Sequence, residues 1–334
     1  MAIMAVIGMV SAQIAPVAIS KSPGVQVQIP QVPTLQSIHT ASISQDITAT
    51  RVRRFLAEDG SVVAVRELFE TNGVLPIPSR DVAFLGVEGE PSGSTLWQKW
   101  AQTYQRFEVL LANSGVFCIR DLGRAQQNYT LHDFGAVVRA GRAARRLVVF
   151  PNVFDRAFWV VDVDSQTNAL LYSAEFDSQL RLLSEVEVVS FQPSARLLPL
   201  QAGSFYVDFA SASPNMVNQV GLINPDITLA TSYAMDSVEI RDDALSGLQA
   251  MVASYSDGVD QILVVQMPGT SDWLAGLPGT SKGGQAMGRR YRDPTMSVHM
   301  FWEGGVTFHV AGGGAQVCLE PLAKRIYLQA LNTP

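Results

Sequence analysis

The chain has 334 residues, of which 47% are hydrophobic and only 16% charged, and its formal net charge is −6. A typical soluble protein has about 25% charged residues, so this low content favours a surface largely covered by other subunits. The negative charge argues against a protein that grips nucleic acid through a broad basic face. The two cysteines, Cys118 and Cys318, are too few for a disulfide scaffold, and we expect both to be buried free thiols.

Residues 1–50 are predicted to form an extended N-terminal arm, because they contain one lysine, one acidic residue and four prolines, and show no helical period. The opening MAIMAVIGMVSAQ lacks the basic residue that precedes a signal sequence. It is also shorter than the roughly 20 apolar residues that span a bilayer. We therefore expect the arm to be retained, to span no membrane and to pack on its own domain or a neighbour through Ile3, Val6, Ile14, Val25 and Val27.

Residues 51–334 are predicted to form one mainly β domain, because short apolar runs alternate with Gly, Pro, Asp and Ser. Two helices are expected within it, over 94–112 and 130–144, and a long loop over 268–284. Strands without regular βαβ alternation indicate an antiparallel β-sandwich or barrel with inserted short helices. The expected strands are 61–69, 81–87, 115–122, 145–152, 157–164, 169–176, 184–191, 203–210, 261–268, 297–304, 305–312 and 324–331.

No catalytic constellation emerges from the sequence, and HExxH is missing from it. His299 and His309 flank a Trp-Glu-Gly-Gly step, and we interpret them as half-buried histidines at a strand edge rather than as an acid–base pair. The sequence therefore predicts a protein that is not an enzyme and that uses no cofactor.

Two small charged groups are candidates for binding. Asp162 and Asp164 share one face of a strand and are weak candidates for a metal site, although a solvated strand end is the commoner outcome. Arg139, Arg142 and Arg146 would share one face of the second expected helix, where they are candidates for contacts with RNA phosphates. A solvated helix face is again the commoner outcome.

The segment GRRYRDPTMSVHMFWEGGVTFHV, residues 288–310, resembles a region of the jelly-roll capsid subunits of picornavirus-like RNA viruses. ITATRVRRFLAEDGSVVAVREL, residues 47–68, is similar to the region that follows the N-terminal arm in those subunits. The chain departs from the family at Glu303, where arginine is common. The resemblance implies an eight-stranded jelly roll, and Trp302, Gly304 and Gly305 are then expected in close packing against a neighbouring strand or subunit.

The function implied is that of a structural coat subunit of an icosahedral virion, assembled in the host cytoplasm. Its partners would be copies of itself, other capsid subunits and, through limited contacts, genomic RNA; the host receptor is left open. Two alternatives remain: a cementing protein on a larger viral shell, and a secreted β-sandwich that binds carbohydrate or a receptor through Trp273 in the long loop.

Overall fold

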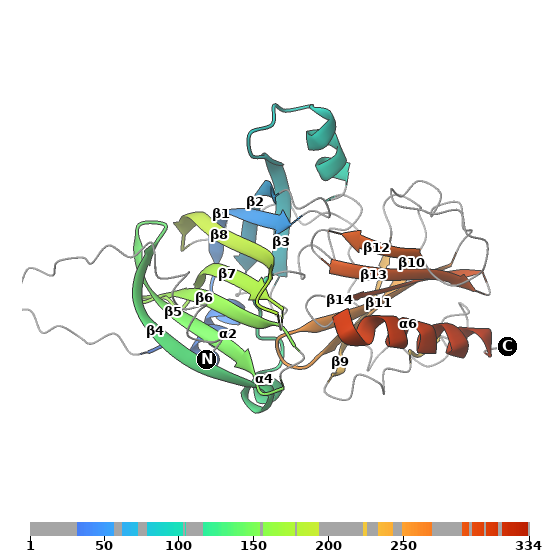
Figure 1. Cartoon of the computed structure of the whole chain (residues 1–334). Helices are drawn as coiled ribbons and strands as arrows, with labels where there is room; N and C mark the ends of the chain where they lie inside the picture. Colours follow the sequence, from blue (N-terminus) through green and yellow to red (C-terminus); the bar gives the residue numbers. More distant parts are fainter. Residues whose placement is uncertain are drawn as a thin grey trace, which may run out of the picture.

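The computed structural model describes 14 parts of the chain, separated by gaps. They are residues 32–56, 62–72, 79–102, 104, 116–153, 156–177, 179–193, 223–225, 233–242, 249–268, 289–293, 296–303, 305–312 and 316–332. Their strands form two separate antiparallel sheets, which lie side by side in Figure 1.

The larger sheet has eight strands in the order β3-β2-β1-β8-β7-β6-β5-β4. Two runs of consecutive antiparallel strands build it, and they join where β1 pairs with β8. The strands are β1 (Ile47–Leu56), β2 (Val62–Asn72), β3 (Ser79–Val87), β4 (Tyr129–Arg139), β5 (Arg142–Pro151), β6 (Phe158–Asp164), β7 (Leu170–Phe176) and β8 (Leu182–Gln192).

Two short helices pack together against one face of this sheet: α2 (Leu35–Ser44) and α4 (Leu122–Asn128). Thr34 caps α2 by accepting a hydrogen bond from the Ser37 backbone N–H at 3.1 Å. The helix buries Leu35, Ile38 and Ala41, which are three residues apart and so lie along one side. Leu35 and Ile38 join a core with Leu147, Val149, Trp159, Val161 and Val163 of β5 and β6.

The smaller sheet has six strands in the order β12-β13-β14-β11-β10-β9. The long helix α6 (Gln316–Leu331) contacts β13 and β14 and packs its buried side on their core (Figure 1). The strands are β9 (Ala234–Asp242), β10 (Gln249–Ser256), β11 (Gln261–Pro268), β12 (Arg289–Asp293), β13 (Met296–Glu303) and β14 (Val306–Gly312).

The predicted class, mainly β with antiparallel sheets and a few short helices, is confirmed. The jelly roll is not what the structure shows. A jelly roll distributes Greek-key strands over two stacked sheets. Here β1–β8 all belong to the larger sheet and β9–β14 all belong to the smaller one.

Several expected elements differ from the observed ones. Within the predicted arm, residues 35–44 are helical and β1 begins at Ile47. Residues 130–144 form most of the β4–β5 hairpin instead of a helix, because Ala140 and Gly141 both have positive φ and make a two-residue turn. Residues 324–331 belong to α6 instead of a strand, and residues 116–119 are irregular.

Other expectations are met or fall outside the described residues. Residues 95–102 are helical, and the Ser94 hydroxyl accepts from the Trp97 backbone N–H at 3.1 Å, as an N-cap does. The strand expected over 203–210 lies outside the described residues, as do residues 1–31 of the arm and residues 269–284 of the long loop.

Candidate functional site

An apolar pocket lies between α2 and the larger sheet. Its walls come from α2, β1, β2, β7, β8 and the segment 116–120, and its volume is about 900 Å³ with the part open to solvent included. The apolar lining includes Ile38, Ala49, Phe69, Phe117, Leu170 and Val188. An ordinary core closes such a space, because protein interiors are packed as densely as organic crystals.

The sequence explains why the space stays open. Along β1, Ile47, Ala49 and Arg51 face the pocket at the two-residue period of a strand. Ala41 from α2 and Ala169, just before β7, also line it. These alanines stand where a larger side chain would fill the gap between helix and sheet.

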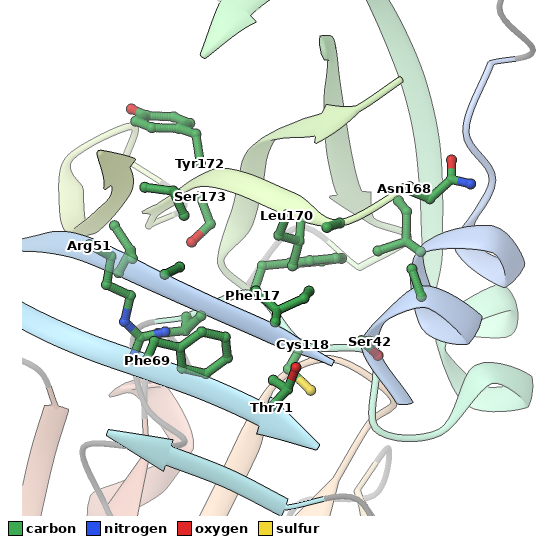
Figure 2. Close-up of a pocket in the computed structure, with 18 of the residues that line it drawn as sticks. Ser42, Arg51, Phe69, Thr71, Phe117, Cys118, Asn168, Leu170, Tyr172 and Ser173 are labelled. Carbon is green, nitrogen blue, oxygen red and sulfur yellow. The ribbon is translucent and has the colours of Figure 1, made fainter. Parts of the chain in front are cut away.

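The polar groups of the pocket lie toward its sides. Figure 2 shows Arg51 and Phe69 on one side, Ser42 and Asn168 on the other, and Phe117 and Leu170 between them. Cys118 also lines the pocket and is buried, as expected for this residue. The arrangement suits a long molecule with an apolar body and one polar end.

Arg51 belongs to a buried charge cluster at its side of the pocket. Its Nε donates to Glu67 at 2.5 Å, and Arg53 Nε lies 2.8 Å from the other oxygen of the same carboxylate. The hydroxyl of Tyr104 donates to Glu67 as well. Burial by itself would raise the pKa of Glu67, but Arg51, Arg53 and the Tyr104 hydroxyl together bring that pKa below its usual value.

A second polar cluster joins the two sheets. The tight turn between β10 and β11, residues 257–260, inserts into the larger sheet's core, where Val259 packs with Ile119 and Ala125. The Gly258 carbonyl accepts from the Arg120 backbone N–H at 2.9 Å. Arg120 also lines the pocket, so this turn holds one wall of it in place.

The candidate RNA contacts are engaged inside the protein. Arg139 and Arg146 both bind Asp162, with Nε to carboxylate distances of 2.6 and 2.8 Å. Arg142 binds Asp164 at 2.9 Å. These ion pairs cross β4, β5 and β6 and hold the strands together, whereas the sequence offered these arginines as candidates for nucleic-acid contacts on a helix face.

The candidate metal ligands are likewise committed. Asp162 and Asp164 are 0% and 1% exposed, in contrast to the solvated strand end expected for them. Throughout the described parts of the chain, no group of three His, Cys, Asp or Glu side chains is placed to hold a metal ion. Their carboxylates serve as anchors for the arginines.

The structure describes only some of the candidate interface residues. Ile3, Val6, Ile14, Val25, Val27 and Gly304 lie outside the described residues. Trp302 is 42% exposed on β13. Gly305 has φ +81° and open space around it, so the β13–β14 turn requires this glycine for its backbone conformation and not for close packing.

Sequence reasoning missed the pocket residues. Arg51 stood in a segment interpreted by its resemblance to a coat subunit, and Glu67 was given no role. The available signal was the alternation along β1, in which two charged residues, Arg51 and Arg53, follow Ile47 and Ala49 on the buried face. A buried arginine needs an acidic partner, and that requirement pointed to the neighbouring strand.

No protein-family model and no curated protein sequence matches the chain. Among solved structures, it is similar to MucB, with 15% identity over 88% of this chain and 94% of that one and a TM-score of 0.49. A Pseudomonas aeruginosa MucA/MucB complex matches at 16% identity over 86% of this chain and 95% of that one, with a TM-score of 0.44. A lipoprotein-sorting protein domain from Vibrio parahaemolyticus matches at 10% identity over 49% of this chain and 92% of that one, with a TM-score of 0.21.

The prediction of a viral capsid subunit is wrong. The strands β1–β8 form one sheet and β9–β14 form the other, which differs from the jelly roll of a coat protein. The predicted virion location is therefore wrong as well, and the predicted capsid partners are not supported. Among the described helices, none combines the length and apolar character needed to cross a membrane.

Proposed function

We propose that this chain is a non-catalytic binding protein that holds the apolar part of an amphiphilic ligand in the pocket between α2 and the larger sheet. The observation that carries the proposal is an apolar space of about 900 Å³, open to solvent in part, whose walls are otherwise well-packed core residues. Pockets that take small molecules are mostly apolar, with a few polar groups.

The character of the walls supports a flexible apolar chain as the bound group. Ile38, Val186 and Val188 present aliphatic surface, and Phe69 and Phe117 add aromatic faces. A carbohydrate would need several hydrogen-bonding groups along its length, whereas the polar groups here lie at the sides. Burial of a hydrocarbon chain stabilises a complex by about 0.8 kcal/mol per CH₂ group. The space beside the alanines can accept such a chain.

The absence of reaction is also part of the proposal. Ser42 of α2 and Thr71 of β2 carry hydroxyl groups that line the pocket. The Ser42 hydroxyl donates to the His39 carbonyl at 2.7 Å, and that of Thr71 donates to the Gln45 carbonyl at 2.8 Å. Both hydroxyls are therefore engaged with backbone oxygen rather than with a base.

Binding can be tested with N-phenylnaphthylamine, a neutral probe that fluoresces in apolar sites. We expect saturable binding to the whole chain, and displacement by long-chain amphiphiles. Ala49→Leu should fill the pocket and weaken binding at least about tenfold, since about three added carbons occupy the space. Ala136→Leu, an equal change at an exposed position of β4, is the matched control. Equal binding by both variants would place the probe elsewhere and overturn the proposal.

A further inference from the structure

The guanidinium of Arg51 has one nitrogen that no protein group satisfies. Arg51 is 2% exposed, and its Nη2 has no hydrogen-bond partner among the residues that the structure describes. The same side chain lines the apolar pocket (Figure 2). A buried N–H without a partner costs about 1–3 kcal/mol, and more on a charged group, so this donor calls for an acceptor from outside the chain.

The neighbouring carboxylate is already shared. Glu67 accepts from Arg51 Nε, from Arg53 Nη2 at 3.4 Å and from the Tyr104 hydroxyl, so both of its oxygens are engaged. The ring of Phe69 lies against the Arg51 guanidinium, whose carbon is 4.3 Å from the ring centroid. Glu67 on one edge and Phe69 on one face fix the orientation of the guanidinium.

We infer that the ligand of this pocket is a long-chain monocarboxylate, whose carboxylate accepts a hydrogen bond from Arg51 Nη2 and whose hydrocarbon chain runs past Phe117 and Leu170 toward α2. The inference rests on the proposed function and names the class of ligand for the same site. It follows from the order of groups across the pocket, with the free donor on one side and apolar walls leading away from it.

A carboxylate suits this donor better than a phosphate. Glu67 already occupies Arg51 Nε, so the head group meets Arg51 at Nη2 and not at Nε. The Glu67 carboxylate beside it would also repel a dianion more strongly than a monoanion. A single negative oxygen meets the requirement of Nη2 with the smaller cost of leaving water.

The test compares three ligands with matched chains, palmitate, methyl palmitate and hexadecyl phosphate, as competitors of bound N-phenylnaphthylamine at neutral pH. We expect palmitate to bind about tenfold or more tightly than its methyl ester, which keeps the chain and loses the charge. Equal binding of acid and ester would overturn the carboxylate assignment and leave the apolar pocket standing. Tighter binding of the phosphate would overturn it in favour of a phosphate head group. Failure of all three to displace the probe would overturn this inference and the proposed function together.

A variant locates the contact on Arg51. Arg51→Gln should weaken palmitate about tenfold and leave methyl palmitate unchanged, because only the charged head group loses its donor. Arg66→Gln, at a partly exposed arginine of β2 paired with Glu88 at 3.5 Å, is the control and should change neither affinity. Retained preference for the acid in a folded Arg51→Gln protein would contradict the assignment. If that variant does not fold, the ratio of acid to ester in the unaltered protein decides.

Discussion

The hydroxyl of Tyr129, at the start of β4, donates a hydrogen bond of 2.9 Å to Asp257 at the tip of the β10–β11 turn. The bond joins the first strand of one meander in the larger sheet to the smaller sheet. Arg156 Nη1 reaches the same Asp257 oxygen at 2.6 Å, and Asn128 Nδ2 donates to the Asp257 carbonyl at 2.7 Å. A buried carboxylate thus holds the joint between the sheets.

Removal of the Tyr129 hydroxyl should loosen this joint. We expect Tyr129→Phe to lower the free energy of unfolding by about 1–2 kcal/mol, because Asp257 is fully buried and loses one of its donors. Urea unfolding followed by fluorescence measures the change. Thr130→Val, which removes an exposed hydroxyl bonded to Asn152 at 2.8 Å, serves as the neighbouring control and should cost less than about 0.5 kcal/mol. Equal losses in the free energy of unfolding for the two variants would show that the Tyr129–Asp257 bond stabilises the protein no more than an exposed hydrogen bond does.

Asp260, in the same turn, should make stability depend on pH. Burial, and then the negative charge of Asp257, raise its pKa from the usual 3.8 to about 6, although the Tyr233 hydroxyl and Arg156 act in the opposite direction. The folded protein therefore keeps a proton that the unfolded chain releases. This contribution to stability is present in full below pH 3.8, is lost as the pH rises to about 6 and changes no further above that.

The prediction is tested by the difference between two proteins. Asp260→Asn keeps an acceptor for the Tyr233 hydroxyl but cannot ionise. Relative to the unaltered protein, it should gain on the order of 2 kcal/mol of stability between pH 4 and 6.5, measured by urea unfolding at each pH. A difference that is constant over this window would show that Asp260 does not titrate there. The comparison cancels the opposite trend from Glu67 and Asp164, whose pKa values are lowered.

The Asp162 carboxylate should be among the costliest charges to remove from the larger sheet. It is 0% exposed and binds both Arg139 and Arg146, so Asp162→Asn deprives Arg146 of this buried anion and leaves Arg139 with Glu187 alone. We expect a loss of about 3 kcal/mol in the free energy of unfolding. Glu88→Gln removes the partner of Arg66 at the surface and should cost less than about 0.5 kcal/mol. A loss at Asp162 as small as that of the control would contradict an anchoring role.

The sequence supported the fold class and several strands, since the alternation in 157–164 and 169–176 lies close to β6 and β7. Prediction from the sequence failed where a local pattern fits both a helix and a strand. The segment around Arg139, Arg142 and Arg146 has helical spacing, yet Ala140 and Gly141 adopt positive φ and close a hairpin, which places these arginines opposite Asp162 and Asp164. The choice depends on pairing with β6, which is remote in the sequence.

The pocket could be predicted even less well, because it depends on distances between elements. Ala41 and Ala49 line a pocket only because α2 lies over β1, which the sequence does not show. Arg51 becomes a candidate ligand-binding group only when the structure shows that its partner Glu67 is shared with Arg53. The resemblance to coat subunits rested on short apolar segments with glycines, which β13 and β14 use for an ordinary hairpin.

Gly258 should be the least replaceable residue of the inter-sheet turn. Its φ is +112°, and a Cβ at this position would lie 2.2 Å from the Ala125 backbone nitrogen, closer than any real contact. Gly258→Ala must therefore push the turn away from α4, and we expect a loss of about 3 kcal/mol or more together with faster amide hydrogen exchange over residues 119–128. Gly141→Ala is the matched control, because Gly141 also has a positive φ, +71°, but no atom lies within 4 Å of the added carbon. It should cost about 1 kcal/mol and leave exchange in 119–128 unchanged. If the two alanines had equal effects, backbone conformation alone would explain both, and the close approach of Gly258 to α4 would play no part in joining the sheets.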